Sequence, residues 1–405
     1  MTKVFILGWA LAAIFWAYSI SWIFDAVNYY GAGTTLSLTI SFLLVGYVSI
    51  YFGLFLVALK FFRNSNYRPF IFASTFFILE WFRSWVITGF PWLNLGMLSE
   101  YLWGALPMIG VSGTSFLIVL IISLLFENKY TLLNRGAAGL ILVFLLFGPG
   151  HYQKNGQDTL DLTIIQPLDT NLSQIIKMTN DAESNLVIWP EAVASYDQNL
   201  LTKINNKNVI GGFFRKQGKG FYTSAINLET GHYFDKENLV PFGEFQPLGN
   251  MLSSFNKFFN IPNSNLKVGN SIQDKADWSA LICWELVFND TFTKRVKGSG
   301  YIIHMSNDKW YGESMPRQHL KHAKARAVES NKWVVRSTLD GISQFISPRS
   351  EESSAKLERG VQGSITKTIY LNYIDTAYVK YGDLPLLIIS FVFLLIGLKN
   401  RRNEK

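Results

Sequence analysis

Long apolar runs constrain this chain more than any other feature of its sequence. Six of them have the length and polarity of membrane-spanning helices, namely Val4–Phe24, Leu36–Leu59, Phe70–Phe90, Gly104–Phe126, Gly136–Pro149 and Leu384–Leu398. The last two are short, so each is expected to extend into its flanks or to thin the bilayer locally. The first run continues past its small residues into further apolar and aromatic ones, which predicts an uncleaved span rather than a cleaved signal peptide.

The composition agrees with a chain that needs few solvated faces. Charged residues make up 16% of the 405 residues and the apolar set AVILMFWYC makes up 49%, whereas an ordinary soluble domain carries roughly 25% charge. A single cysteine excludes a disulfide scaffold. The net charge is +8 (37 − 29), and the basic residues lie beside apolar runs, which indicates a membrane and not a nucleic acid as the partner.

The apolar runs divide the chain into three parts. Residues 1–150 are predicted to hold five spans, and residues 384–405 hold the last span and a basic tail. Residues 158–372 contain no long apolar run and are predicted to form a soluble domain. The expected fold class is therefore an α-helical membrane bundle of about six spans with one large inserted α/β domain.

Lys and Arg lie in alternate loops between the predicted spans. The basic positions are Lys60, Arg63, Arg68, Lys129, Arg135, Lys399, Arg401, Arg402 and Lys405, whereas residues 25–35 and 91–103 contain no Lys or Arg. Because loops rich in Lys and Arg stay in the cytoplasm, this pattern predicts that both termini lie inside and the soluble domain outside.

The soluble region alternates short β-branched strands with helix-like segments, which is typical of a layered α/β domain. The predicted strands are Leu160–Gln166, Leu186–Trp189, Val209–Phe213, Ala225–Leu228, Ser279–Cys283, Tyr301–Met305, Trp333–Ser337 and Ser343–Ser347. The predicted helices are Leu172–Thr179, Phe288–Val296 and Arg317–Glu329. Ser347–Gly360 is polar and is predicted to be a loop. No glycine-rich phosphate-binding sequence is present, so no nucleotide is expected.

Three strand ends carry residues that could do chemistry together. Glu191 follows Leu-Val-Ile-Trp-Pro, Lys236 precedes Leu-Val-Pro-Phe-Gly-Glu, and Cys283 follows Ala-Leu-Ile. A carboxylate can take the proton of a thiol, and a fixed cation stabilises the thiolate and the oxyanion that forms when it attacks a carbonyl. Each residue also has an ordinary structural reading: a buried small hydrophobe for the cysteine, and solvated charges for the other two. Spacing alone does not show that the three meet.

Four ordered motifs favour the chemical reading. Trp-Pro-Glu191, Lys236-x-x-Leu-Val-Pro-Phe-Gly-Glu244, Ile-Cys283-x-Glu285 and Ser306-Asn307-Asp308-x-Trp-x-Gly together resemble the nitrilase superfamily. Within it, the chain is similar to the apolipoprotein N-acyltransferase family, which embeds a nitrilase domain among membrane helices. Family members usually have two more helices ahead of the first one here, so the chain is expected to be N-terminally shortened.

The resemblance implies an αββα sandwich and a role for each matched residue. Glu191 would be the general base, Lys236 the cation that stabilises the oxyanion and Cys283 the nucleophile, while Glu244 and Glu285 match acids that orient Lys236 and the site. The implied activity moves an acyl chain from a phospholipid to the N-terminal amino group of diacylglyceryl-cysteine lipoproteins through a cysteine thioester. It needs no metal or other cofactor. The implied location is the bacterial inner membrane, with the catalytic domain on the periplasmic face.

Two other functions stay open at this point. One is a membrane-anchored carbon-nitrogen hydrolase, in which water takes the thioester, and the other is a non-catalytic paralogue that binds lipid or lipoprotein. Ser253–Asn260 would favour acyl transfer if its three Phe residues share a helix face that dips into the bilayer, although they could equally join the domain core.

Two pairs of ionisable residues lie outside the four motifs. Glu80 and Arg83 are spaced to pair within a span, or to fix the depth of its end. His319 and His322 share a helix face as two metal ligands would, but no third ligand is near in the sequence, so no metal is expected.

Overall fold

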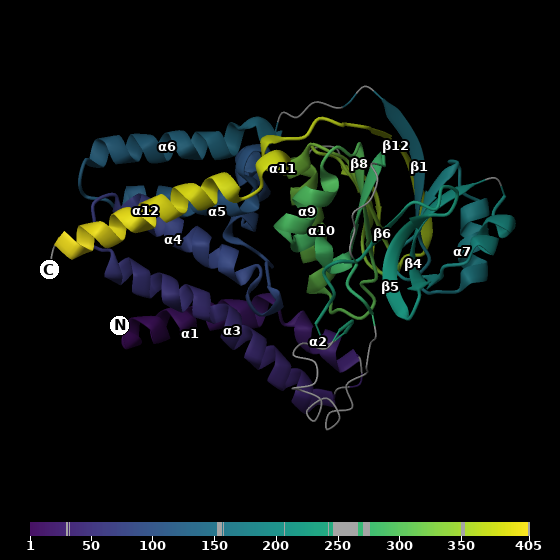
Figure 1. The fold of residues 1–405 in the computed structure, drawn as a ribbon, viewed down its shortest axis with the longest axis horizontal. Coiled ribbons are helices and arrows are strands. Elements are labelled where there is room, and N and C mark those ends of the chain that lie inside the picture. The colour runs from purple at the N-terminus through teal and green to yellow at the C-terminus, as the bar shows by residue number, and fades with distance from the viewer. Residues whose placement is uncertain are drawn as a thin grey trace. The chain divides into compact units, whose positions relative to one another are not determined.

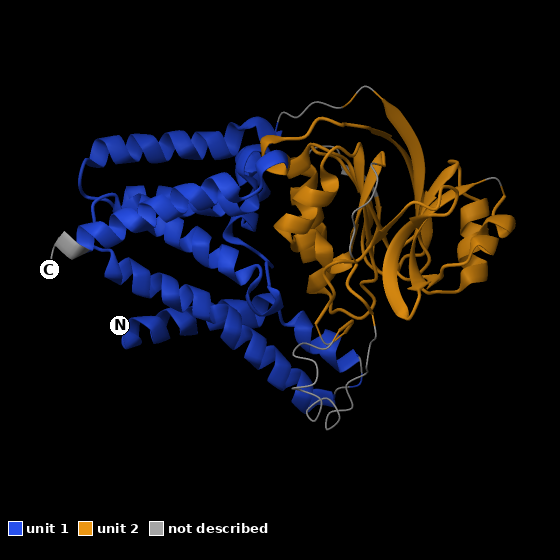
Figure 2. Ribbon diagram, in the orientation of Figure 1, with its two compact units in different colours: residues 1–152, 380–405 blue, residues 153–379 orange. Residues whose placement is uncertain are grey.

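The computed structural model describes residues 1–29, 31, 33–151, 156, 158–205, 207–241, 243–245, 266–269, 276–349 and 353–403. The chain forms two compact units, Met1–Tyr152 with Lys380–Lys405 and Gln153–Val379 (Figure 2). The segment Ser253–Asn260, predicted to be a membrane-dipping helix or part of the core, lies outside the described residues.

The first unit is a bundle of helices. Its α-helices are α1 (Thr2–Ser19), α2 (Trp22–Tyr29), α3 (Gly33–Phe61), α4 (Arg68–Arg83), α5 (Leu106–Leu125), α6 (Thr131–Phe147) and α12 (Leu384–Asn403) (Figure 1). Three short 3₁₀ helices connect α4 to α5, namely η1 (Val86–Thr88), η2 (Leu95–Met97) and η3 (Glu100–Ala105). Large apolar side chains are exposed along α1, α3, α6 and α12, as expected for helices that face lipid.

The predicted number of spans is wrong by one. Five helical segments of the described residues are long and apolar enough to cross a membrane: Thr2–Ser19, Gly33–Phe61, Glu100–Leu125, Thr131–His151 and Leu384–Arg401. The predicted span Phe70–Phe90 does not qualify, because α4 has 16 residues and ends at Arg83. Beyond it the chain turns sharply, with positive φ angles at Ile87 and Thr88. The two short predicted spans do extend into their flanks.

Polar contacts fix both ends of α4. Arg68 at its start forms an ion pair with Glu127 beyond α5, at 2.5 Å, so α4 and α5 are an antiparallel hairpin whose outer ends meet. Glu80 and Arg83 near its end are both buried and lie 3.9 Å apart. The Arg83 guanidinium also donates to the carbonyl of Trp92 at 2.9 Å, so this pair ties α4 to the irregular segment that follows it.

The second unit is built on two β-sheets. The first sheet has seven strands in the order β12-β1-β2-β4-β5-β6, with β3 paired to β4, and the second has the order β11-β10-β9-β8-β7. The strands of the first sheet are β1 (Thr159–Gln166), β2 (Leu186–Ile188), β3 (Ala194–Ser195), β4 (Asn208–Gln217), β5 (Gly220–Asn227), β6 (Tyr233–Asp235) and β12 (Gly363–Tyr370). Those of the second are β7 (Trp278–Ile282), β8 (Tyr301–Ser306), β9 (Val334–Thr338), β10 (Ser343–Ile346) and β11 (Ser353–Leu357).

Helices cover the outer faces of both sheets, giving the predicted αββα order of layers. Helix α7 (Leu172–Asn180) packs on the first sheet, while α9 (Asn289–Val296) and α10 (Ser314–Ser330) pack on the second (Figure 1). The last helix of the region is α11 (Ala377–Tyr381). Between the sheets the Ser337 hydroxyl of β9 donates to the backbone carbonyls of Ile165 at 3.0 Å and Ile188 at 3.3 Å.

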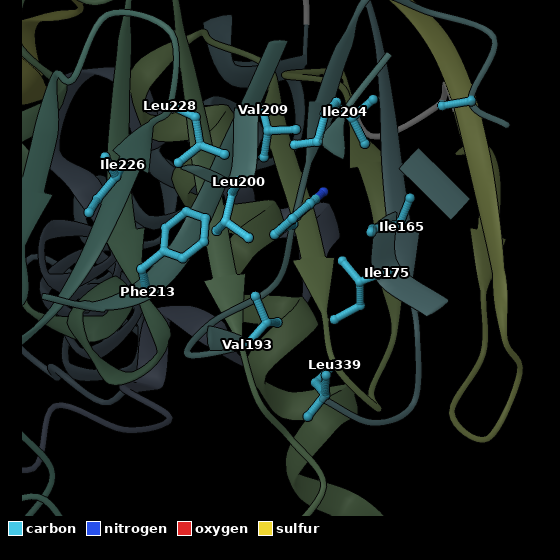
Figure 3. Packing of buried hydrophobic residues seen from close by; sticks show 13 residues of the cluster. Ile165, Ile175, Val193, Leu200, Ile204, Val209, Phe213, Ile226, Leu228 and Leu339 are labelled. Carbon is cyan, nitrogen blue, oxygen red and sulfur yellow. The ribbon is translucent and has the colours of Figure 1, made fainter. Parts of the chain in front are cut away.

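The core under α7 joins residues from α7, β1, β2, β4 and β5 (Figure 3). Ile165, Ile175 and Phe213 are fully buried there. Trp189 lies among them and donates its indole N–H to the Thr179 hydroxyl at 2.8 Å, so its polar atom is satisfied inside the core. This packing holds the end of β2, and with it the start of the Trp-Pro-Glu motif, in one position.

All eight predicted strands and all three predicted helices are present in the second unit, with boundaries shifted by at most five residues. The loop predicted at Ser347–Gly360 is wrong in part, because Ser353–Leu357 forms β11, an edge strand paired antiparallel to β10. An edge strand needs no alternation of apolar residues to pair through its backbone, so a polar segment gave no strand signal.

Candidate active site

Each of the three predicted catalytic residues stands just beyond the end of a buried strand. Glu191 follows β2, Lys236 directly follows β6, and Cys283 directly follows β7. The first two strands belong to the first sheet and β7 to the second. The site therefore depends on both sheets, and its parts come together only when the sandwich is formed.

Lys236 lies between two carboxylates. Its ammonium nitrogen Nζ is 2.9 Å from Glu191 Oε1 and 2.8 Å from Glu244 Oε1, and the residue is 1% exposed. Burial opposes the charge, but the two carboxylates outweigh it and hold the pKa of Lys236 well above its usual value. Lys236 is therefore a permanent buried cation.

Glu191 is held in place from two directions. Oε1 accepts from Lys236, and Oε2 accepts from the backbone N–H of Asn307 at 3.1 Å. Gly212 of β4 permits this packing, since a Cβ there would lie 2.6 Å from the Glu191 Cα. Burial raises the pKa of Glu191 against the opposing effect of Lys236, as a carboxylate needs if it is to accept a proton near neutral pH.

Cys283 has the backbone of a strained residue and the surroundings of a protonated thiol. It opens the 3₁₀ helix η7 (Cys283–Val287) with a φ of +50°, in the left-handed region that side chains other than Asn, Asp and Gly rarely adopt. It is 1% exposed. Burial, and then the charge of Glu191, raises the pKa of the thiol, although Lys236 acts in the opposite direction. The thiol is therefore protonated at rest and needs a base.

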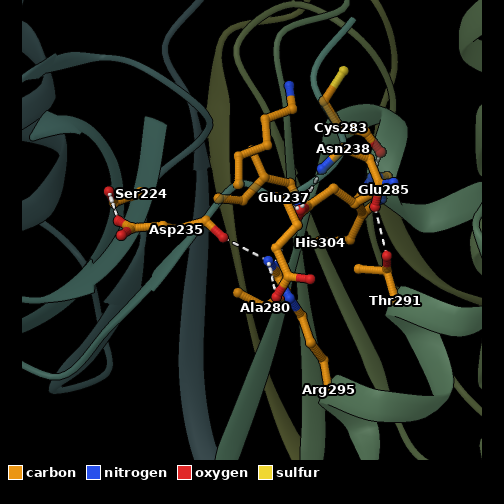
Figure 4. Close-up of polar contacts among 12 residues, drawn as sticks. Ser224, Asp235, Glu237, Asn238, Ala280, Cys283, Glu285, Thr291, Arg295 and His304 are labelled. Carbon is orange, nitrogen blue, oxygen red and sulfur yellow. Dashed lines mark hydrogen bonds and ion pairs between the residues drawn. The ribbon is translucent and has the colours of Figure 1, made fainter. Parts of the chain in front are cut away.

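The two further acids of the motifs, Glu244 and Glu285, contact different parts of the site. Glu244 contacts Lys236 directly, and its other oxygen accepts from the backbone N–H of Val240 at 2.8 Å. Glu285 instead accepts from the N–H of Glu237 at 2.5 Å and of Ile282 at 2.9 Å, and it pairs with Arg295 at 2.8 Å (Figure 4). It thus fastens the chain just after Lys236 to the chain just before Cys283.

The chain also matches two family models over most of its length. Residues 1–124 match the apolipoprotein N-acyltransferase N-terminal domain, and residues 166–377 match the carbon-nitrogen hydrolase model. The apolipoprotein N-acyltransferase of Wigglesworthia glossinidia brevipalpis is 30% identical over 426 residues, which cover 93% of this chain and 85% of that protein. The chain belongs to the apolipoprotein N-acyltransferase family.

Other apolipoprotein N-acyltransferases give the same result. That of Haemophilus influenzae is 27% identical over 450 residues, covering 96% of this chain and 84% of that protein. Among solved structures, a CN-hydrolase superfamily protein from Xanthomonas campestris is 15% identical, with a TM-score of 0.39, and covers 57% of this chain and 97% of that one. The family resemblance inferred from the four motifs is confirmed.

Several polar residues of this member of the N-acyltransferase family were not predicted as part of the site. Arg295 of α9 donates to the backbone carbonyls of Ala280 at 3.1 Å and Asp235 at 2.5 Å, which joins the middle of β7 to the end of β6 (Figure 4). His304 of β8 donates to the backbone carbonyl of Cys283 at 3.3 Å, and Arg336 of β9 in turn donates to His304 at 2.7 Å. The sequence holds a signal for both: His304 interrupts an apolar run and Arg336 follows the apolar run Trp333–Val335, and a polar side chain buried there requires a partner.

His319, one of the two histidines considered as metal ligands, contacts the backbone of Cys283. The Nε2 atom of His319 donates to the backbone carbonyl of Cys283 at 3.2 Å, and its Nδ1 atom lies 3.4 Å from Asp308. Within the described part of the chain, no three His, Cys, Asp or Glu side chains are grouped as a metal site would require. His319 therefore belongs to the surroundings of Cys283.

Proposed function

We propose that this protein transfers an acyl chain from a membrane phospholipid to the α-amino group of an N-terminal diacylglyceryl-cysteine, with Glu191, Lys236 and Cys283 as the catalytic residues. One observation carries the proposal. A permanently charged lysine, a carboxylate with a raised pKa and the single thiol interact electrostatically with one another in a buried site. Membership of the apolipoprotein N-acyltransferase family supports these substrates, because the residues alone specify only thiol chemistry on a carbonyl compound.

In the first half-reaction the phospholipid ester is cleaved. Glu191 takes the proton of the Cys283 thiol as the sulfur attacks the ester carbonyl, and Lys236 stabilises the negative charge that develops on the carbonyl oxygen. Collapse of the tetrahedral intermediate breaks the bond to the glycerol oxygen, and Glu191 returns the proton to that oxygen. The products are a lysophospholipid and a thioester on Cys283.

In the second half-reaction the amino group of the acceptor attacks the thioester. Glu191 now takes a proton from the amine, and Lys236 stabilises the second oxyanion. Collapse forms the amide and expels the sulfur, which regains its proton from Glu191. At the end of each half-reaction Glu191 and Lys236 have the same protonation states as at its start. The acyl group is therefore activated only by the ester bond of the donor.

We place residues 158–372 as the catalytic domain and residues 1–150 and 384–405 as the membrane part. Within the helical unit, the guanidinium of Arg401 at the end of α12 donates to the carbonyl of Phe61 at the end of α3, at 2.6 Å. Figure 1 shows Met1 and the end of α12 toward the same end of this unit. The gathering of basic residues there supports a bacterial inner-membrane protein whose C-terminal tail is cytoplasmic and whose catalytic domain is periplasmic.

Protease added to intact spheroplasts is expected to cut the catalytic domain while a tag placed after Lys405 stays protected. The reason is that α12 separates the domain from the basic tail, and Lys and Arg hold that tail inside. Immunoblotting for the tag and for the domain reads the result, with lysed spheroplasts as the control in which both are cut. Loss of the tag with an intact domain would reverse the proposed orientation.

Replacing Lys236 with methionine is expected to slow acyl transfer by about 10²–10³-fold, the usual cost of losing one preorganised oxyanion donor. Lys332→Met is the matched control, because Lys332 is another fully buried lysine of the same domain, 3.2 Å from Asp375. Both variants lose a buried, paired cation, but only the first should lose turnover relative to folded protein. Equal activity of the two variants would make Lys236 structural.

The proposed activity is tested by where the acyl chain goes. Purified protein in detergent is incubated with a phospholipid that carries a labelled acyl chain and a synthetic peptide that begins with diacylglyceryl-cysteine. Labelled N-acyl peptide is the expected product, and blocking the peptide's α-amino group by acetylation should remove it. Release of labelled fatty acid at the same rate with either peptide would show a hydrolase, and no consumption of phospholipid would show a binding protein.

A further inference from the structure

The backbone carbonyl of Cys283 receives two imidazole N–H donors. His304 Nε2 on β8 lies 3.3 Å from the carbonyl oxygen, and His319 Nε2 on α10 lies 3.2 Å from it. The two rings meet edge to face, with centroids 4.7 Å apart, and both residues are fully buried. The mechanism above uses neither histidine. Buried imidazoles need partners for their polar atoms, and here both find one in the same carbonyl oxygen.

Arg336 and Asp308 close this arrangement into a ring of four side chains. Arg336 donates from Nη1 to His304 Nδ1 at 2.7 Å and from Nη2 to Asp308 Oδ2 at 2.5 Å. Asp308 Oδ1 lies 3.4 Å from His319 Nδ1. We call His304, Arg336, Asp308 and His319 the carbonyl ring, because both of its ends meet at the Cys283 carbonyl.

The chemistry of the donors fixes the proton on His304. Arginine can only donate, so His304 Nδ1 must accept, and its single proton is then on Nε2, which faces the Cys283 carbonyl. Burial and Arg336 lower the pKa of His304 well below its usual value, in agreement with a neutral ring. On His319 the carbonyl likewise requires a proton on Nε2.

The surrounding backbone leaves room for the ring. A Cβ at position 341 would lie 2.6 Å from Asp308 Oδ2, so glycine at this position allows the carboxylate to reach Arg336. The Ser306 hydroxyl donates to Asp308 Oδ1 at 2.5 Å. Arg336 also donates from Nε to the carbonyl of Ile342 at 2.9 Å. Every polar atom of the Arg336 guanidinium fork is thus committed to one geometry.

The feature that needs such support is the backbone of Cys283. A φ of +50° is costly for cysteine and persists only where the surroundings hold it. A change in φ rotates the carbonyl carbon and the Cβ of Cys283 together about the N–Cα bond. Two donors that hold the carbonyl therefore also oppose movement of the sulfur.

We propose that the carbonyl ring positions the nucleophile: its two imidazole donors hold Cys283 in the left-handed conformation from which the sulfur attacks. The four ring members are positioning residues, because they act through the backbone carbonyl of Cys283. The proposal rests on the proposed function only in taking Cys283 as the nucleophile.

His319→Leu and His304→Leu test the ring by kinetics. Each is expected to slow acyl-enzyme formation by about 10²-fold while KM for phospholipid stays within about twofold, because a misplaced nucleophile affects reaction more than binding. His319→Gln and His304→Gln retain an N–H at the position of Nε2 and should recover most of the rate. His232→Leu is the control, an imidazole outside the ring packed against Phe234 and Trp278.

A direct readout uses the fact that the chain has one cysteine. Cysteine labelled with ¹³C at its carbonyl marks the Cys283 carbonyl alone, and the ¹³C shift of a carbonyl reports its hydrogen bonds. The signal should move upfield in each Leu variant and further in the double variant, while His232→Leu leaves it in place. This measurement needs neither substrate nor turnover.

The outcomes separate the ring from the proposed function. If the signal moves and alkylation of Cys283 by iodoacetamide slows in the Leu variants, the ring positions the thiol even if no acyl-enzyme forms with phospholipid. If the signal does not move, or if the folded Leu variants keep the wild-type rate of alkylation, the proposal is overturned. Recovery with Gln distinguishes loss of a donor from general damage to the core.

Discussion

The Cys283→Ser variant is expected to form no detectable acyl-enzyme and to lose acyl transfer by more than about 10⁴-fold. A hydroxyl has a far higher pKa than a thiol, and the Glu191 carboxylate cannot activate it to a comparable degree. The burial that raises the pKa of the thiol would disfavour an alkoxide even more strongly. The measurement is the rate of N-acyl peptide formation from labelled phospholipid.

The size of the substituted side chain hardly changes, so the fold should survive. Thermal unfolding of Cys283→Ser should resemble that of the wild type, and Cys283→Ala should be equally inactive although it leaves a small cavity. If either variant formed N-acyl peptide at a rate near that of the wild type, another residue would be the nucleophile. If Cys283→Ser were inactive because it does not fold, Cys283→Ala measured in a stabilising detergent mixture would show whether the folded protein needs the thiol.

Replacing Glu191 with glutamine is expected to slow acyl-enzyme formation by about 10²–10⁴-fold, the usual contribution of a general base. The amide keeps the shape and the acceptor atom for Lys236 but cannot take the thiol proton. Because the pKa of Cys283 is raised, the defect should shrink as pH increases and hydroxide removes the proton instead. The pH dependence of the single-turnover rate measures this recovery.

The pH dependence of the wild-type rate provides a second test of Glu191 as the base. Burial raises the pKa of Glu191, so the wild-type rate should fall as pH decreases through a value above that of an ordinary glutamate, and Glu191→Gln should lack this acidic limb. Glu244→Gln is the matched control. Glu244 contacts the same Lys236 nitrogen at 2.8 Å, and its substitution leaves the Glu191 carboxylate unchanged. An identical profile for the wild type and Glu191→Gln would exclude Glu191 as the base.

The sequence predicted the strands and the residues at their ends because both signals are local. An apolar β-branched run predicts a buried strand, and Glu191, Lys236 and Cys283 each stand next to such a run. That Lys236 lies within 3 Å of both Glu191 and Glu244 depends on the order of β2 and β6 in the first sheet and on the loop that follows β6, since these residues are separated in the chain by up to 45 positions. The family resemblance supplied this contact before the structure did.

What the sequence could not predict depends on long-range pairing. The polar strand β11 has no apolar alternation and is recognised only by its partner β10. The end of α4 at Arg83 follows from its contacts with the carbonyl of Trp92 and the side chain of Asn94, which draw the chain away from a helix. Likewise, the two imidazoles at the Cys283 carbonyl come from β8 and α10, and nothing local relates them.

The measurement that tests the central claim most directly is the intact mass of the protein after incubation with a phospholipid of known acyl composition. The wild type should gain the mass of one acyl group, located on Cys283 by peptide mapping and removed by neutral hydroxylamine, as expected for a thioester. Addition of the diacylglyceryl-cysteine peptide should return the protein to its original mass as N-acyl peptide forms. An unchanged mass after incubation with phospholipid alone, or an acyl group on any residue other than Cys283, would contradict the proposed mechanism.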